Sequence, residues 1–184
     1  MANAKKNTRI TTGIVRLSYV HLFEPTPNPS GELKYSVAIL IPKSDKKTLA
    51  AISEAIGNAI ENGADKFNGI SKNKLKNPLR DGDEDRPGDA AYEGCYFINA
   101  NNSRKPKVVN ASLQEVIDPE EVYSGCYAKA CITFYPFSAS GNRGIACSID
   151  AVQKIRDGES LGGGSVNVND VFSAEDDDDD DMLG

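Results

Sequence analysis

Ten residues in the last third of the chain alternate between two kinds of side chain. Residues 126–135 read Cys-Tyr-Ala-Lys-Ala-Cys-Ile-Thr-Phe-Tyr, so that every second side chain is small or apolar. Successive side chains of a β-strand point to opposite faces of a sheet, so a period of two is typical of a strand. The pattern predicts a strand with a buried face and an outward face that carries Tyr127, Lys129 and Tyr135.

The rest of the chain predicts more strands and one main helix. Apolar residues recur at helical spacing only in residues 44–62, where Ser44 is the expected N-cap. Three prolines and a glycine predict a loop over residues 24–31. The other predicted strands cover residues 10–23, 33–41, 94–100, 107–116 and 144–155. Short strands with turns between them favour a mainly β fold, and we expect a partly open, OB-fold-like barrel with one inserted α-helix.

The first predicted strand, residues 10–23, has its own alternation. It predicts Val15, Leu17 and Tyr19 on one face and Arg16 on the other. His21, the one histidine of the chain, lies in this apolar strand, where a structural role is more common than catalysis. We find no phosphate-binding loop, no serine elbow and no cysteine near a histidine in sequence, so we expect no catalytic residue and no cofactor.

Charge divides the chain into two parts. The last ten residues hold seven of the 27 acidic residues, which leaves 20 acids against 21 Lys and Arg in the rest. Such dense blocks of like charge are usually disordered interaction tails, although a tail that only confers solubility is the alternative. We therefore expect a flexible N-terminus at 1–8, a folded domain at 9–160, and a flexible Gly-rich linker with an acidic tail at 161–184. The expected partner-binding residues are Glu175, Asp176, Asp177, Asp178, Asp179, Asp180, Asp181, Met182 and Leu183.

The outward face of the 126–135 strand suggests nucleic-acid binding. Aromatic rings stack on bases and a lysine meets phosphates, although exposed tyrosines are also common in sheets for reasons of β-propensity. Further candidate DNA-binding residues are Tyr96, Arg104, Lys105 and Lys107, and then Lys72, Lys74, Lys76 and Arg80.

Three alternating carboxylates, Asp81, Asp83 and Asp85, are similar in spacing to a calcium loop. Arg86 stands where that loop needs glycine and Tyr92 where it needs glutamate, so we expect no metal. The four cysteines lie in apolar strand-like stretches without zinc-site spacing, and we interpret them as reduced and buried rather than as disulfides or metal ligands. No apolar run approaches the roughly 20 residues that span a bilayer, and no signal peptide is present, so we expect a soluble intracellular protein.

Several stretches between residues 9 and 160 resemble a family of phage single-stranded-DNA-binding proteins. They are YVHLFEP at 19–25, YSVAILIPK at 35–43, NPLRDGD at 77–83, YFINA at 96–100, YSGCY at 123–127, GIAC at 144–147 and VQKIRDG at 152–158. The resemblance implies an oligonucleotide-binding barrel that acts in phage DNA replication, recombination and repair in the cytoplasm of an infected bacterium. It also implies a tail that competes with DNA and recruits replication or recombination proteins.

The tail departs from the pattern that the resemblance implies. Tails of this functional class often finish on an aromatic residue, whereas this chain ends Met182-Leu183-Gly184 and its Phe172 precedes the acids. Two other functions compete with DNA binding: a scaffold or virion protein that uses the tail to bind basic partners, and a metal-dependent nuclease built on Asp81, Asp83 and Asp85. Binding of duplex DNA and formation of a homodimer are both left open by the sequence.

Overall fold

The computed structural model describes residues 5–67, 69–139, 141–161 and 172–174. The predicted linker and acidic tail therefore lie almost entirely outside the described residues, as does the side chain of Lys72. Residues 6–8, which we assigned to the flexible N-terminus, hydrogen-bond to the folded domain. The backbone of Lys6 pairs with the Asn62 side chain, and the Thr8 carbonyl accepts from the Phe134 amide at 3.0 Å.

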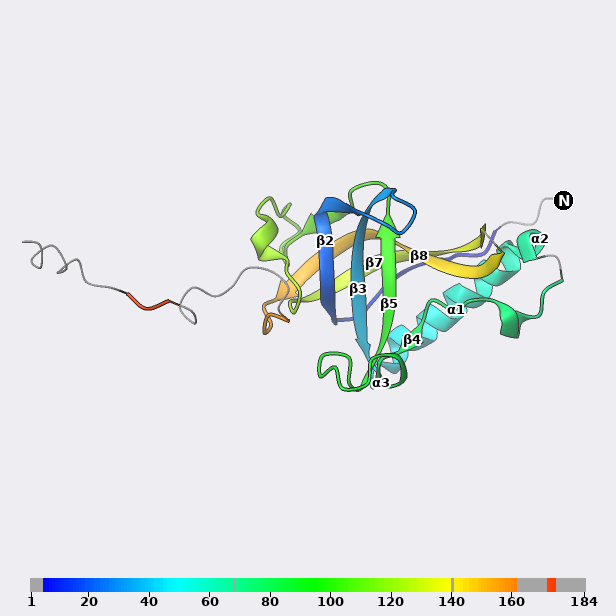
Figure 1. The fold of residues 1–184 in the computed structure, drawn as a ribbon, viewed down its shortest axis with the longest axis horizontal. Helices are drawn as coiled ribbons and strands as arrows, with labels where there is room; N and C mark the ends of the chain where they lie inside the picture. The colour runs from blue at the N-terminus through cyan, green and yellow to red at the C-terminus, as the bar shows by residue number, and fades with distance from the viewer. Residues whose placement is uncertain (1–4, 68, 140, 162–171, 175–184) are drawn as a thin grey trace, which may run out of the picture.

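Five strands form a barrel with the connectivity of an OB-fold (Figure 1). They are β2 (Val15–Pro27), β3 (Leu33–Pro42), β5 (Cys95–Asn102), β7 (Tyr127–Ala139) and β8 (Asn142–Arg156). The order β2-β3-β5-β8-β7 returns to β2, because Val15 and Arg16 pair with Ala128 and Tyr127. All neighbours are antiparallel except β5 and β8. The predicted mainly β barrel is confirmed.

The barrel is partly open between β5 and β8. These two strands share only the pair Asn101 and Ser148, and the chain before β5 occupies the gap on one side. There the Lys76 amide donates to the Arg143 carbonyl and the Lys76 carbonyl accepts from the Ile145 amide. The short strand β4 (Arg80–Asp81) then pairs with β5. The segment before β5, whose sequence shows no strand pattern, therefore completes the barrel wall between β5 and β8.

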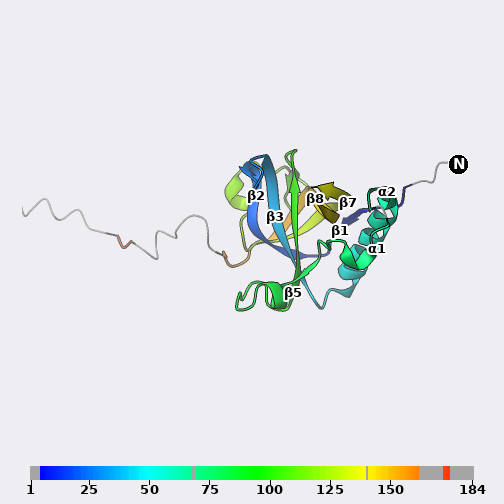
Figure 2. The same ribbon diagram turned by 45° about the vertical axis from the view of Figure 1, so that its right-hand side comes forward.

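Helix α1 (Lys46–Asn62) lies outside the barrel against the far part of the β7–β8 hairpin (Figure 2). Its N-cap is Asp45 and not the predicted Ser44, since a carboxylate oxygen of Asp45 accepts from the Thr48 amide at 3.1 Å. Ile52, Ile56 and Ala59 are buried on the helix face that meets the strands. The remaining elements are β1 (Arg9–Thr11), α2 (Ala64–Phe67), η1 (Lys72–Lys74), α3 (Gly82–Asp85), β6 (Lys107–Val109) and η2 (Pro119–Glu121).

The largest differences between predicted and observed strand boundaries occur at three places. The predicted strand at 10–23 is split into β1 and β2, and a Cβ on Gly13 between them would lie 2.9 Å from a carboxylate oxygen of Asp45. Strand β2 continues to Pro27 through the predicted Pro-rich loop. Strand β6 ends at Val109, because Asn110 turns the chain by accepting from the amides of residues 112 and 114.

The inward face of β7 is the predicted one. Ala128, Ala130, Ile132 and Phe134 are at most 1% exposed and belong to the main hydrophobic core. All four cysteines are free thiols: Cys126 and Cys147 are buried, while Cys95 and Cys131 are half-buried. Burial raises the pKa of the Cys126 thiol above its usual range. Among the described residues, the helices are all too short or too polar to cross a membrane.

Candidate nucleic-acid interface

A bulge in β2 turns an additional aromatic ring outward. Ser18 pairs with Ala38 and His21 pairs with Ser36, so β2 has two residues between these pairs where β3 has one. Tyr19 takes up the extra residue with a φ of 47°, and it is 54% exposed. The prediction that Tyr19 faces inward with Leu17 is wrong, because one extra residue reverses the alternation of side chains.

Arg86 links Tyr19 to the loop that precedes β5. Its Nη2 donates to the Tyr19 hydroxyl at 2.8 Å and to a carboxylate oxygen of Asp89 at 3.2 Å. Its guanidinium carbon lies 5.5 Å from the ring centroid of Tyr19 and 4.6 Å from that of Tyr92. The hydrogen bond with Tyr19 raises the pKa of Arg86, and burial raises the pKa of Tyr92. Tyr92 is only 2% exposed and packs edge-on against Phe97.

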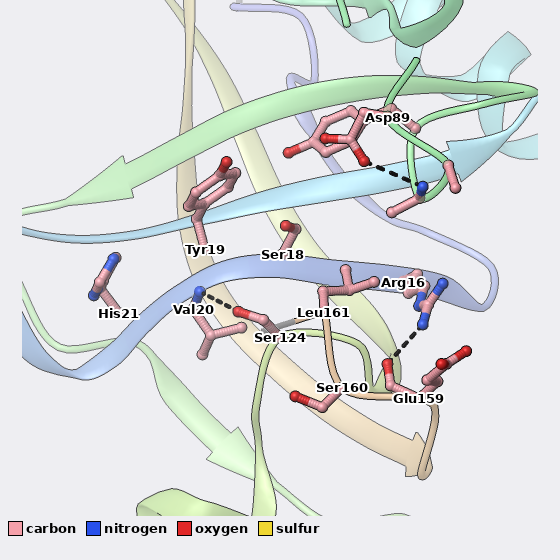
Figure 3. A pocket seen from close by; sticks show the side chains of 13 residues that line it. Arg16, Ser18, Tyr19, Val20, His21, Asp89, Ser124, Glu159, Ser160 and Leu161 are labelled. Atoms are coloured by element: carbon pink, nitrogen blue, oxygen red, sulfur yellow. Dashed lines mark hydrogen bonds between the residues drawn. The ribbon is translucent and has the colours of Figure 1, made fainter. Parts of the chain in front are cut away.

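A pocket of about 630 Å³ opens over the outward face of β2, and we call it the β2 pocket (Figure 3). The residues that line it are Arg16, Ser18, Tyr19, Val20, His21, residues 89–92, Ser124 and residues 159–161. His21 is therefore an exposed wall residue rather than the structural residue that its sequence context predicts. Figure 3 shows Tyr19 above the strand and Arg16 directed toward the Glu159 backbone.

Tyr127, a predicted DNA-binding residue, lies next to the β2 pocket. The guanidinium of Arg16 is 5.6 Å from its ring centroid and that of Arg156 is 4.6 Å away. Arg16 also donates from Nη2 to the Glu159 carbonyl at 2.7 Å and from Nε to the Gly125 carbonyl at 3.1 Å. The half-buried ring of Tyr127 thus has two cations beside it, and neither of these cations has a carboxylate partner among the ion pairs of the described residues.

A second pocket of about 520 Å³ lies between β5 and the β7–β8 hairpin, and we call it the β5 pocket. Lys76 and Arg80, two of the predicted DNA-binding residues, line it together with Phe137. Asn99 and Asn101 line it from the outward face of β5. Tyr135 is 39% exposed, and its cross-strand partner Ala146 lines the same pocket.

A polar row joins the two pockets across three strands. The register aligns His21 of β2, Ser36 of β3 and Asn101 of β5, all on the outward face. His21 lines the β2 pocket and Asn101 lines the β5 pocket. Neighbouring strands lie about 4.8 Å apart, so the row spans about 10 Å. None of its side chains is acidic. The pairing of the strands alone therefore creates a continuous neutral path from the β2 pocket, lined by Arg16, Asp89 and Glu159, to the β5 pocket, lined by Lys76 and Arg80.

The other predicted DNA-binding residues lie elsewhere on the barrel. Tyr96 packs under Lys43, whose ammonium is 5.1 Å from the ring centroid. Lys105 lies 5.3 Å from the ring centroid of Phe23 and lines a third pocket, of about 410 Å³, together with Lys107. Arg104 and Lys74 are exposed, and Lys129 is half-buried on the outward face of β7. The structure brings Lys76, Arg80 and Tyr127 to the two main pockets, with Tyr135 beside one of them.

The acidic cluster at 81–85 is engaged by cationic side chains. The Lys43 ammonium lies 2.8 Å from Asp81 and 2.8 Å from Asp83, and Arg80 pairs with Asp85 at 2.8 Å. Hydrogen bonds from Lys43 lower the pKa of both Asp81 and Asp83, and the same bonds raise the pKa of Lys43. These carboxylates therefore fasten the loop before β5 to the barrel. Sequence reasoning did not detect this role, because Lys43 lies some 40 positions earlier.

Sequence reasoning also missed several residues of the two pockets. Arg16, Tyr19, His21 and Phe137, which line the pockets, and Arg86, which contacts Tyr19, were not among the candidate sites. Alternation in β2 places Arg16 outward and could have indicated it. Arg86 stands among acidic residues outside any alternating pattern, so nothing in the sequence indicated it. The outward direction of Tyr19 depends on the bulge, which the sequence does not show.

The chain matches the family model described as Enterobacter phage Enc34, ssDNA-binding protein, over residues 8–183. Protein p50 of Acyrthosiphon pisum secondary endosymbiont phage 1 is 33% identical over 166 residues. That alignment covers 86% of this chain and 89% of the phage protein.

Solved structures with the same fold agree with this match. The bacteriophage Enc34 single-stranded DNA-binding protein in complex with ssDNA is 28% identical with a TM-score of 0.67, covering 88% of this chain and 97% of that one. A C-terminal truncation of the Enc34 protein gives a TM-score of 0.72, covering 88% and 95%. The bacteriophage T7 single-stranded DNA binding protein gp2.5 is 15% identical with a TM-score of 0.60, covering 92% and 96%, and shows the fold alone.

Proposed function

Because the chain belongs to the single-stranded-DNA-binding protein family of Enterobacter phage Enc34, we propose that it binds single-stranded DNA on the outward face of β2, β3 and β5. The observation that carries this proposal is the polar row of His21, Ser36 and Asn101 between two pockets. Arg16 lines the first pocket, and Lys76 and Arg80 line the second. The second and third strands of an OB-fold, here β3 and β5, form its oligonucleotide-binding face, and β2 extends this face.

The side chains on this path suit a strand without a defined sequence. Tyr19, Tyr127 and Phe137 offer rings for base stacking, and every base has a face that can stack. Arg16 and Lys76 attract phosphates, which carry no sequence information, while Arg80 shares its charge with Asp85. We therefore propose binding with little sequence preference and without catalysis. We propose that DNA extending beyond the two pockets contacts Tyr135, Lys129 and the other lysines and arginines that were predicted to bind DNA.

The biological role that we propose is the one that the sequence resemblance implies. The protein would coat single strands during phage DNA replication, recombination and repair in the cytoplasm of the infected host. The acidic tail would compete with DNA for the cationic side chains of this face and recruit replication or recombination proteins. The charge of the two parts supports this arrangement, since seven carboxylates of the last ten residues follow a domain with near-zero net charge.

A fluorescence anisotropy titration with labelled oligo(dT) tests the DNA-binding proposal. We expect saturable binding whose log affinity falls with log salt by about 0.7 for each phosphate contact. Affinity that stays flat between low and moderate salt would contradict the proposed face. Failure to bind, together with capture of a basic protein, would favour the scaffold alternative. Degradation of the oligonucleotide only when magnesium is present would favour the nuclease alternative.

A further inference from the structure

The backbone of Tyr19 has a conformation that non-glycine residues rarely adopt. Its φ of 47° lies in the left-handed region, and Leu113 is the only other non-glycine residue with a positive φ in the described part of the chain. The bulge directs the ring away from the core, where Leu17 and Leu22 on the same strand are fully buried. A ring placed this way needs a partner to hold it, because the core does not pack against it.

Arg86 supplies that partner from a loop with fixed ends. The Arg86 amide donates to the Gly82 carbonyl at 3.0 Å, and its guanidinium lies 4.6 Å from the buried ring of Tyr92. The same guanidinium donates to Asp89 at 3.2 Å and to the Tyr19 hydroxyl at 2.8 Å. Arg86 therefore joins a buried aromatic residue to an exposed one, and both of these aromatic residues line the β2 pocket.

We propose that Arg86 is a positioning residue, which holds the Tyr19 ring at the edge of the β2 pocket so that a DNA base stacks on it. This inference rests on the proposed DNA-binding function and adds a specific division of roles. Tyr19 contacts the base, and Arg86 acts through Tyr19 rather than through a phosphate. A planar guanidinium with several donors can bond to a hydroxyl and a carboxylate while it stacks on Tyr92, and a lysine cannot do all three.

The two explanations for Arg86 predict different results for Arg86→Lys. If Arg86 attracts phosphate as a charge, lysine retains most of the affinity. If Arg86 positions Tyr19, lysine loses the geometry and affinity falls although the charge is kept. Tyr19→Phe keeps the ring and removes only the hydroxyl that Arg86 bonds, so it should reproduce the loss.

The test is a double-mutant cycle of Tyr19→Phe and Arg86→Lys, titrated with oligo(dT) by anisotropy. We expect each single variant to bind about three- to tenfold more weakly, as for the loss of one hydrogen bond. The double variant should be no weaker than the weaker single variant, because both changes break the same contact. The salt slope of Arg86→Lys and of Arg86→Gln should match that of the unaltered protein, whereas a lost phosphate contact would reduce the slope by about 0.7.

A base-stacking readout and a matched control complete the design. An oligo(dT) that carries one 2-aminopurine should be quenched less at saturation by Arg86→Lys and by Tyr19→Ala than by the unaltered protein. A role confined to folding would leave this saturated signal unchanged. Arg9→Lys, an exposed arginine on β1 outside both pockets, should bind as the unaltered protein does.

Different results would refute the role of Arg86 and the proposed DNA-binding function. Absence of oligo(dT) binding by the unaltered protein would refute the DNA-binding function itself. Binding by the unaltered protein, with additive losses in the cycle or full affinity in Arg86→Lys, would overturn the role of Arg86 and leave DNA binding intact.

Discussion

Arginines accompany the aromatic side chains of the β2 pocket at the scale of single residues. Arg86 lies beside Tyr19 and Tyr92, and Arg16 and Arg156 lie beside Tyr127. An arginine stays charged at any physiological pH and is weakly hydrated, so it can rest against a ring and still meet a phosphate. In the proposed DNA binding, Tyr127 therefore offers a stacking surface beside the charges of Arg16 and Arg156, whereas Arg86 holds the ring of Tyr19.

Substitutions on the two faces of β7 should have opposite effects. Tyr127→Ala and Tyr135→Ala should each weaken oligo(dT) binding by about 1–3 kcal/mol, the usual contribution of one stacked base, without loss of cooperative melting. Phe134→Ala, on the buried face between them, should instead lower the free energy of unfolding by about 3–5 kcal/mol. Anisotropy and thermal melting of the three variants test this, and unfolding of the tyrosine variants with a tolerated Phe134→Ala would contradict the assignment.

Strands β7 and β2 show where side-chain alternation predicts the two faces of a strand and where it does not. In β7 the alternation predicted both faces correctly, because all residues from Tyr127 to Phe134 keep their inward or outward direction. In β2 it failed at Tyr19, because a bulge of one residue reverses the side chains that follow it, as far as the second irregularity between His21 and Thr26. No glycine or proline in Ser18-Tyr19-Val20 marks the bulge, and the pairing that creates it lies on β3.

The loop between α3 and β5 is the part of the fold that was hardest to predict from the sequence. Its position depends on ion pairs between distant parts of the chain, which no local pattern encodes. Lys43, just after β3, holds Asp81 and Asp83, and Asp83 accepts from the Gly94 amide at 3.0 Å. The buried ring of Tyr92 then packs with Leu40 and Phe97. This small second cluster covers β3 and β5 at Leu40 and Phe97, and its Tyr92 forms part of the wall of the β2 pocket.

Replacement of Lys43 should release the carboxylates that it holds. The hydrogen bond from Lys43 lowers the pKa of Asp83 below its ordinary value of 3.8, so the loop contact persists above that value and is lost as the pH falls through the lowered pKa. In an NMR titration, the Gly94 amide shift should follow Asp83 with a midpoint below 3.8. Lys43→Met should move this midpoint up toward 3.8, while Lys47→Met on exposed α1 should not. An unchanged midpoint in Lys43→Met would show that Lys43 does not hold the loop.

At the scale of the whole molecule, the proposed DNA-binding face lies next to the start of the predicted linker. Residues after β8 cross the barrel next to the β2 pocket: the Tyr123 hydroxyl donates to the Gly158 carbonyl at 2.9 Å, and the Leu161 amide donates to the Ser124 carbonyl at 2.9 Å. The Leu161 side chain packs with the cluster of Leu40, Tyr92 and Phe97. The linker therefore begins at the wall of the β2 pocket, a position that follows from tertiary contacts and that charge counting alone does not predict.

Deletion of residues 174–184 should tighten oligo(dT) binding at low salt. A Gly-rich tether of about 15 residues reaches roughly 20 Å, which keeps the acidic tail near the pockets at millimolar effective concentration. Salt should remove the difference between the two forms, because exposed charges are screened within about 10 Å at 0.1 M. Anisotropy across a salt series measures this, and replacement of Asp176 to Asp181 by asparagine is the control that keeps the tail length. This control should also bind more tightly, whereas equal low-salt affinity of all three proteins would mean that the tail never occupies the DNA-binding face.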